Sequence, residues 1–154
     1  MIENSKAPDF TLKVDGNNEI TLSNFTGKNV VLYFYPKDDT PGCTTEAKDF
    51  ANAAAEFASL NTVVIGISKD TVASHDKFKA KYSLPFILAS DITCEISKMY
   101  GVWIEKSMFG KKYFGIDRST FLIDKNQIIK KIWRKVSVTG HVKEVLATIT
   151  SQGM

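Results

Sequence analysis

The sequence predicts an α/β fold: a three-layer sandwich in which a central mixed sheet carries helices on both faces, preceded by an N-terminal hairpin. The hydrophobic period along the chain switches between two residues and about 3.6 residues, the periods of strands and helices. Two segments, 29–35 and 62–67, are unbroken β-branched and aromatic runs. Such runs are typical of strands that are covered on both faces.

The first half of the chain is predicted to form the hairpin and then a β-α-β-α unit. Apolar and polar residues alternate on both sides of Asp15-Gly16-Asn17-Asn18, a run typical of a turn. One helix begins after Thr40, and a second is predicted over Thr71 to Tyr82. The strands predicted in this half are residues 10–14, 20–22, 29–35, 62–67 and 86–88.

The second half is predicted to add a helix, another hairpin and a final helix. Asp91 is the expected N-cap of the third helix, and Thr139 to Thr150 closes the chain as the last one. Strands at 120–124 and 127–133 form a hairpin around Asp124-Lys125-Asn126. This order of elements is that of a thioredoxin-like sandwich. With no linker or internal repeat, residues 1–154 are expected to form a single domain.

Composition excludes several classes of protein. A chain of 154 residues with 44% hydrophobic and 24% charged residues is ordinary globular material. Its two cysteines are too few for a disulfide-built secreted scaffold. The longest apolar run, Val30 to Pro36, is far shorter than the roughly 18 residues of a membrane span, and the start of the chain does not look like a signal peptide. We therefore expect a cytoplasmic protein with reduced thiols and no membrane partner.

The charge pattern argues against a nucleic-acid partner. The formal net charge is +3, and the densest basic patches, Lys111-Lys112 and Lys130-Lys131, are only pairs. Arginine occurs only at Arg118 and Arg134. Because lysine is the usual basic residue here, each arginine calls for a specific reason.

Cys43 lies where a buried strand runs through a tight loop into a helix. Thr40 is a good N-cap and Pro41 suits the first helical position, so Cys43 falls in the first turn. Unpaired N–H groups and the helix dipole there favour a negative charge, which is a known way to lower a thiol pKa. Helical spacing also places Cys43 on the core-facing side, with Ala47 and Phe50. The alternative is a buried structural cysteine.

Residues 36–43 (PKDDTPGC) resemble the active-site motif of the peroxiredoxins: proline, three residues, threonine, two residues, cysteine. The flanking sequence is similar to one subfamily, the bacterioferritin comigratory protein or Q-type group. The resemblance continues in order along nearly the whole chain. The other matching segments are residues 7–10, 66–68, 84–86, 90–91, 100–103, 105–106 and 115–124.

The resemblance implies a thiol peroxidase that reduces hydrogen peroxide and organic hydroperoxides. Cys43 would be the nucleophile that becomes a sulfenic acid. The Thr40 hydroxyl, the loop N–H groups and the Arg118 guanidinium would stabilise the departing oxygen. Pro36 would shape the loop and keep water away. Thioredoxin or another thiol would be the reductant, and the protein would be a monomer without a cofactor.

Cys94 departs from the commonest Q-type pattern, in which a second, resolving cysteine stands where this chain has Lys48. A helical wheel over the third helix places Cys94 opposite the face formed by Ile92, Ile96, Met99 and Tyr100. We therefore expect Cys94 to be exposed. It either resolves Cys43 within the chain after local unfolding, or an outside thiol does so in a one-cysteine mechanism.

Two other functions and a metal site fit the sequence less well. A thiol-disulfide exchange protein of the same fold would need a second cysteine three residues after the first, where this chain has Glu46. A non-catalytic binding module would use the lysine-rich surface and would leave the Cys43 thiol unperturbed. His75 and His141 lie apart, with no cysteine or carboxylate at ligand spacing, so no metal is implied.

Overall fold

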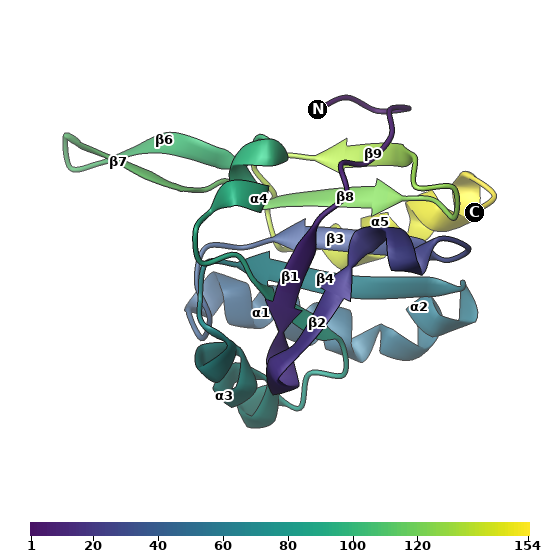
Figure 1. Ribbon diagram of the computed structural model, residues 1–154, viewed down its shortest axis with the longest axis horizontal. Coiled ribbons are helices and arrows are strands. Elements are labelled where there is room, and N and C mark those ends of the chain that lie inside the picture. The colour runs from purple at the N-terminus through teal and green to yellow at the C-terminus, as the bar shows by residue number, and fades with distance from the viewer.

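A seven-stranded mixed sheet is the middle layer of the computed structural model, which describes residues 1–154 (Figure 1). The strands are β1 (Thr11–Val14), β2 (Asn18–Thr21), β3 (Asn29–Phe34), β4 (Thr62–Ser68), β5 (Ile87–Ser90), β6 (Trp103–Met108), β7 (Lys111–Ile116), β8 (Ser119–Ile123) and β9 (Ile129–Trp133). The sheet order is β2-β1-β5-β4-β3-β8-β9, and β6 and β7 pair separately. β3, β4 and β5 are parallel, so their carboxyl ends meet at one edge.

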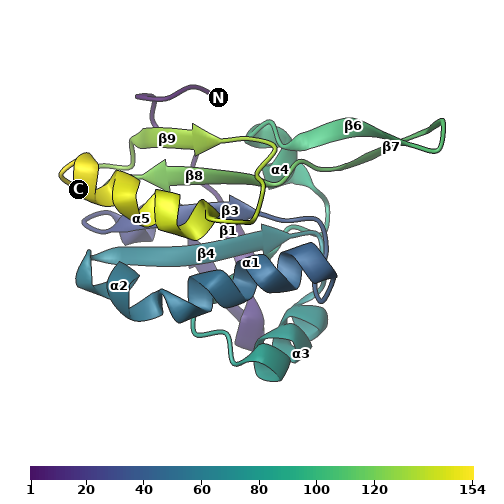
Figure 2. The same ribbon diagram turned by 180° about the vertical axis from the view of Figure 1, so that it is seen from behind.

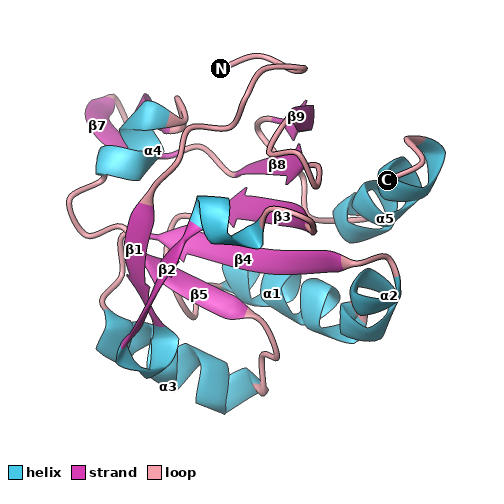
Figure 3. Ribbon diagram, turned by 45° about the vertical axis from the view of Figure 1, so that its right-hand side comes forward, coloured by secondary structure: helices cyan, strands magenta, loops and turns pink.

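Helices cover both faces of this sheet, as expected. The helices are α1 (Pro41–Asn52), α2 (Ala54–Ser59), α3 (Val72–Tyr82), α4 (Glu95–Met99) and α5 (His141–Ser151), with short 3-10 turns η1 (Asp15–Asn17) and η2 (Leu22–Phe25). Figure 2 shows α1, α2, α3 and α5 on one side of the sheet, and Figure 3 shows α4 and η2 on the other. None of the helices combines the length and the apolar character that crossing a membrane requires.

The central strand β3 divides the core in two. Val30, Leu32 and Phe34 pack into the cluster beneath α4, while Val31 and Tyr33 pack into the cluster beneath α1 and α5. All six residues of β3 are buried. Successive side chains of a strand point to opposite faces, so an unbroken apolar run is what a strand between two cores needs.

Most predicted elements are confirmed, with ends shifted by a few residues. The first hairpin, the helix after Thr40 and the helix after Thr71 begin where their turn and cap residues indicate; Thr71 accepts a hydrogen bond from the Ser74 amide. The last hairpin and the C-terminal helix are also present.

The hairpin of β6 and β7 was not predicted. It projects away from the sheet (Figure 1) and turns at Phe109-Gly110, both with positive φ, as a two-residue hairpin turn requires. Most of its side chains are exposed or half-buried on both faces, and Phe109 is 98% exposed. Without a buried face, the strands show no alternation of apolar and polar residues, and the sequence signal is missing.

The third helix starts later than predicted. α4 begins at Glu95, and Cys94 is the preceding residue with a left-handed backbone (φ 61°, ψ 16°). Asp91 still caps the helix, but from further away: its carboxylate accepts hydrogen bonds from the amides of Ile96 and Ser97 at 3.2 and 2.8 Å. The capping chemistry was correct, while the helix boundary was wrong.

Candidate active site

Cys43 is the third residue of α1 and lies just beyond the carboxyl end of β3. Thr40 has the extended backbone of an N-cap (φ −102°, ψ 157°), and Pro41 is the first helical residue, as predicted. The Cys43 side chain is only 2% exposed and belongs to the core cluster that includes Ala47 and Phe50. The thiol is thus buried at the end of a helix where backbone amides lack intrahelical acceptors.

Arg118 makes direct contact with this thiol. It precedes β8, and β8 pairs with β3 through Ser119 and Phe34, so the register brings Arg118 to the carboxyl end of β3. Its Nη2 donates to Cys43 Sγ at 3.3 Å. Gly42 permits this approach, because a Cβ at that position would lie 3.2 Å from Nη2. The structure therefore brings together two residues that are far apart in the sequence.

Glu46 holds the other side of the guanidinium and was missed as a site residue. Arg118 Nη1 donates to Glu46 Oε1 at 2.7 Å. Burial raises the pKa of Glu46 to about 7, although the nearby Arg118 charge lowers it. Its second oxygen, Oε2, is buried without a hydrogen-bond partner. Glu46 follows Cys43 by three residues on the core-facing side of the helix, and an acidic residue in that position is a signal that could have identified it.

The charges of this cluster also act on the arginine. Burial lowers the pKa of Arg118, but the negative charges of Glu46 and Cys43 outweigh burial and raise it. The guanidinium therefore stays charged next to the sulfur. The N–H groups of a guanidinium held in this way can stabilise a thiolate and any negative charge that develops on an oxygen beside it.

Thr40 and Pro36 lie in the loop that leads into α1. Both are half-buried. The Thr40 hydroxyl donates to the backbone carbonyl of Lys37 at 2.8 Å, which closes the loop upon itself. The structure therefore places Pro36, Thr40 and Cys43 in one short segment, with Arg118 approaching from β8. The oxygen of the Thr40 hydroxyl keeps its acceptor capacity.

A second polar cluster, largely buried, lies behind this loop, and no pattern in the sequence indicates it. The carboxylate of Asp38 contacts His75 Nδ1 at 2.7 Å, and Asp70 accepts from the Asp38 amide at 2.8 Å. One ligand-type atom from each of Asp38, Asp70 and His75 lies within 4.8 Å of the others. Spacing along the chain did not reveal these carboxylates, because the fold joins segments that are distant in sequence. The contacting oxygens are already hydrogen-bond acceptors within the chain.

Cys94 is buried, so the expectation of an exposed thiol was wrong. Only 7% of the residue is exposed, and burial together with the charge of Asp91 raises the pKa of its thiol. The helical wheel failed because Cys94 precedes α4 and has non-helical backbone angles. In the structure Ser97 is buried, whereas Ile92 and Met99 are exposed.

The elements beside the two thiols pack on different faces of the sheet. Cys43 packs in the core beneath α1. Ile96, a residue of α4 that lies two positions after Cys94, packs in the core on the opposite face. Both follow parallel strands, β3 and β5, whose carboxyl ends meet at the same edge. Both cysteines are free thiols, and the side-chain hydrogen bond of Cys43 is made by Arg118 rather than by Cys94.

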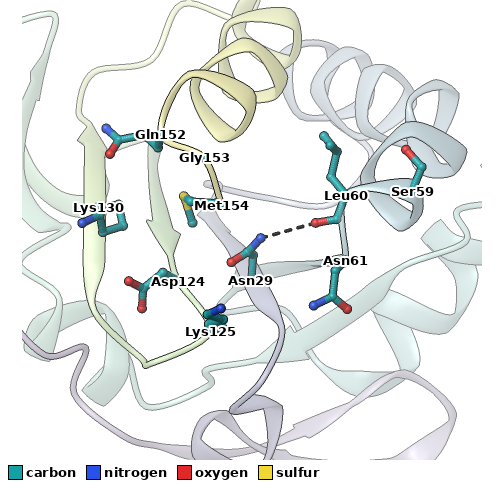
Figure 4. Close-up of a pocket in the computed structure, with 10 residues that line it drawn as sticks. All are labelled: Asn29, Ser59, Leu60, Asn61, Asp124, Lys125, Lys130, Gln152, Gly153 and Met154. Atoms are coloured by element: carbon teal, nitrogen blue, oxygen red, sulfur yellow. Dashed lines mark hydrogen bonds between the residues drawn. The ribbon is translucent and has the colours of Figure 1, made fainter.

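The pocket drawn in Figure 4 lies at the other end of β3. It has a volume of about 430 Å³, and most of its lining residues are polar. Asn29, the first residue of β3, donates to the Leu60 carbonyl at 3.3 Å within it. The C-terminal residue, Met154, also lines it. None of the residues around Cys43 takes part, so this pocket is separate from the candidate active site.

Comparison with known proteins agrees with this geometry. The model of the AhpC/TSA family matches residues 4–132. The chain is 52% identical to peroxiredoxin Bcp of Bacillus subtilis over 144 residues, which cover 94% of this chain and 92% of that protein. It is 43% identical to peroxiredoxin Bcp of Xanthomonas campestris, over 92% of this chain and 88% of the relative.

Solved structures give the same result. Peroxiredoxin Q of Xanthomonas campestris matches with a TM-score of 0.90 and 41% identity, over 94% of this chain and 92% of that one. PrxQ of Xylella fastidiosa matches with a TM-score of 0.95 and 39% identity, over 100% and 98%. Fold, motif and sequence agree along almost the full length, and the chain therefore belongs to the AhpC/TSA family, among the peroxiredoxins of the Bcp and PrxQ type.

Proposed function

We propose that this peroxiredoxin reduces hydrogen peroxide and organic hydroperoxides with Cys43 as the nucleophile. The observation that carries the proposal is the contact between the Arg118 guanidinium and Cys43 Sγ at 3.3 Å, in the first turn of α1. A charged donor on a buried sulfur suits a thiolate better than a structural thiol. A structural neighbour, the bacterioferritin comigratory protein of Xanthomonas campestris, is described with an alkyl peroxide reduction activity.

In the first step, the Cys43 thiolate attacks one oxygen of the hydroperoxide. An S–O bond forms while the O–O bond breaks, so the sulfur is oxidised by two electrons to a sulfenic acid. The departing oxygen leaves as hydroxide or alkoxide and takes a proton from solvent to give water or an alcohol. Arg118 has donors in a rigid fork, and it can stabilise both the attacking sulfur and the negative charge that develops on oxygen.

Thr40 and Pro36 are proposed to shape the space that the peroxide enters. The amides of Gly42 and Cys43 lie in the first turn of α1, where a helix leaves N–H groups free to bind an anionic oxygen. The Thr40 hydroxyl, held by the Lys37 carbonyl, offers its oxygen as an acceptor for the peroxide O–H. Pro36 covers the loop without adding a competing N–H group.

We further propose that an outside thiol, of the thioredoxin type, restores Cys43. A reductant thiol attacks the sulfenic sulfur, water leaves and a mixed disulfide forms. A second thiol of the reductant then displaces Cys43 as a thiolate, and the reductant leaves as a disulfide. Burial of Cys94 and the raised pKa of its thiol favour this one-cysteine route over resolution by Cys94.

The arrangement is complete within one chain, because Cys43, Glu46 and Arg118 all come from the same copy. This supports a monomeric, single-domain enzyme. The cytoplasm is the proposed location, since reducing conditions keep both thiols available.

The test is peroxide consumption with a thioredoxin-type reductant, measured for the parent protein and for Cys43→Ser. We expect activity in the parent and none above background in the variant. Equal rates in the two proteins would reject the proposal and would favour a binding module. Exchange of a disulfide substrate without peroxide would instead favour the thiol-disulfide exchange function.

A further inference from the structure

The loop of residues 36–42, which leads into Cys43, makes most of its side-chain hydrogen bonds to the segment that leads into and through α3. Asp38, in the middle of this loop, is buried and is the centre of the contacts. Its Oδ2 contacts His75 Nδ1 at 2.7 Å and accepts from the Ser74 hydroxyl at 2.8 Å. Its Oδ1 accepts from the Tyr35 hydroxyl at 2.6 Å. Its amide donates to Asp70 Oδ2, also at 2.8 Å.

Both ring nitrogens of His75 face oxygen atoms. Nε2 lies 2.9 Å from the carbonyl oxygen of Ala89, which is the next-to-last residue of β5, and Nδ1 faces Asp38. A carbonyl oxygen cannot donate, so Nε2 must carry a proton. One further proton must lie between Nδ1 and the carboxylate of Asp38, whichever partner formally holds it. The loop is thus joined through His75 to α3 and to β5 by a fully buried, charge-assisted bond.

We propose that His75 is a positioning residue, which through Asp38 holds the loop at residues 36–42 closed over Cys43. The proposal rests on the proposed peroxidase function. The loop continues directly into the first turn of α1, so its position fixes where the Cys43 sulfur lies relative to Arg118. Nothing else that is fully buried ties the loop to the body of the protein from the side of α3.

A second tie, made by Asp39, is of a different kind. Asp39 pairs with Lys81 at 2.8 Å and with the Tyr82 hydroxyl at 2.6 Å, and its side chain is 41% exposed. Exposed pairs of this kind contribute little, because water competes with both partners. A buried pair that loses one partner leaves the other unsatisfied in a dry environment. We therefore expect loss of the contact between Asp38 and His75 to displace the loop more than loss of the Asp39 contacts does.

Closure matters in opposite ways for the two half-reactions. Attack on a small peroxide should use the closed form, because Cys43 contacts Arg118 in it. Attack on a sulfenic acid by a protein thiol needs the sulfur to become accessible, and Cys43 is only 2% exposed when the loop is closed. Weakening the tie should therefore slow the peroxide reaction and, at the same time, speed reaction with a bulky reagent.

Two substitutions at His75 separate its two bonds. The amide nitrogen of asparagine can lie near the position of Nδ1, and that of glutamine near Nε2. His75→Asn can keep the bond to Asp38 and loses the bond to Ala89, while His75→Gln does the reverse. His141 is another buried histidine, bonded to Thr120 on β8 and not to the loop, so His141→Gln controls for the loss of a buried ring.

Two rates are measured for each variant: oxidation of Cys43 by hydrogen peroxide, and its alkylation by a bulky maleimide in the reduced protein, read by peptide mass spectrometry. For His75→Gln we expect oxidation to slow by about tenfold or more, since a displacement of about 1 Å at a reacting group can cost about 100-fold. Alkylation should become faster by a similar factor. His75→Asn should change both rates less, and His141→Gln should keep both near the parent values.

Unchanged rates in His75→Gln would overturn the proposal, and so would an equal fall of both rates, which indicates general loss of structure. If His75→Gln does not fold, Asp38→Ala removes the same contact from the loop side, and the same opposite shifts are expected from it. If both single variants fold, the double variant with His75→Gln and Asp38→Ala should change the two rates by less than the combined single effects. Both substitutions break the same contact. A parent protein without peroxidase activity would reject the proposed function instead, while the alkylation rates would still test the tie.

Discussion

The two cysteines of this chain show how differently one residue type behaves at two positions on the same sheet edge. Cys43 lies inside the first turn of a helix of 12 residues and receives a hydrogen bond from Arg118. Cys94 lies one residue before a helix of five residues, has a left-handed backbone, and faces the charge of Asp91. A cation therefore donates directly to the Cys43 sulfur, whereas at Cys94 burial and the charge of Asp91 outweigh the charges of Lys69 and Lys98, which lower the thiol pKa.

The difference shows that burial alone does not indicate whether a site can support a thiolate. Both residues are more than nine-tenths buried. The charged partner of the sulfur is what separates the two sites. For Cys94 burial and Asp91 act in the same direction and raise the pKa of the thiol.

The largest expected effect contrasts the two thiols directly. Cys94→Ser should keep peroxidase activity within about threefold of the parent, whereas Cys43→Ser should lose it, because only Cys43 can act as the nucleophile. After one equivalent of peroxide, peptide mass spectrometry should find a sulfenic acid at Cys43 and no disulfide between residues 43 and 94. An intramolecular disulfide would show that Cys94 does reach Cys43, and the contrast would be broken.

Removing the cation tests the feature that separates the two environments. Arg118→Met should lower the rate of Cys43 oxidation by about 100- to 1000-fold, the usual effect of losing one donor that stabilises a developing oxyanion. Arg134→Met is the matched control, since it removes the only other arginine and should change the rate by less than about twofold. Stopped-flow measurement of peroxide oxidation gives both values. A similar loss in the two variants would mean that net charge, rather than the contact with sulfur, matters.

The pH dependence of stability tests the buried partner of Arg118. The pKa of Glu46 rises on folding from 4.5 to about 7, so the folded protein holds this proton more tightly than the unfolded chain does. The free energy of unfolding should therefore fall as pH rises through this window, by about 3 kcal/mol in total, and should level off above it. Urea denaturation at several pH values measures this slope.

Glu46→Gln should remove that slope, because an amide does not titrate. Glu56→Gln, a change at an exposed carboxylate in α2, should leave the slope of the parent in place. If Glu46→Gln keeps the parent profile, the slope belongs to another group.

The smallest expected effect concerns the backbone at Cys94. Asparagine tolerates the left-handed region better than a β-branched residue, so Cys94→Asn should be more stable than Cys94→Val, although its amide is partly desolvated at this buried position. Cys94→Val should lower the free energy of unfolding by about 1–2 kcal/mol, since a β-branched residue is strained there. Thermal or urea denaturation distinguishes the two. Equal stabilities would mean that the left-handed conformation relaxes at no cost.

Local patterns predicted the parts of the structure that local interactions determine. The alternation around the Asp15-Gly16 turn, the caps at Thr40 and Thr71, and the apolar run of β3 each correspond to an element of the structure. The family motif also led to Cys43 and Arg118, and the structure shows them in contact.

Features that depend on packing could not be predicted in the same way. The contact between Asp38 and His75 joins residues that are 37 positions apart, and no periodicity signals it. The hairpin of β6 and β7 has no buried face and so no hydrophobic pattern. The exposure of Cys94 was misjudged because a helical wheel assumes helical angles, and Cys94 does not have them.

The position of the C-terminus has a practical consequence for attaching the protein to a surface. Met154 lies beside Asn29 at the start of β3, whereas Cys43 follows the end of that strand. At about 3.3 Å per residue, the length of β3 separates the two by roughly 20 Å. A tether on the C-terminus would therefore leave the Cys43 end of the molecule facing solution, which is the orientation that an immobilised peroxide sensor needs.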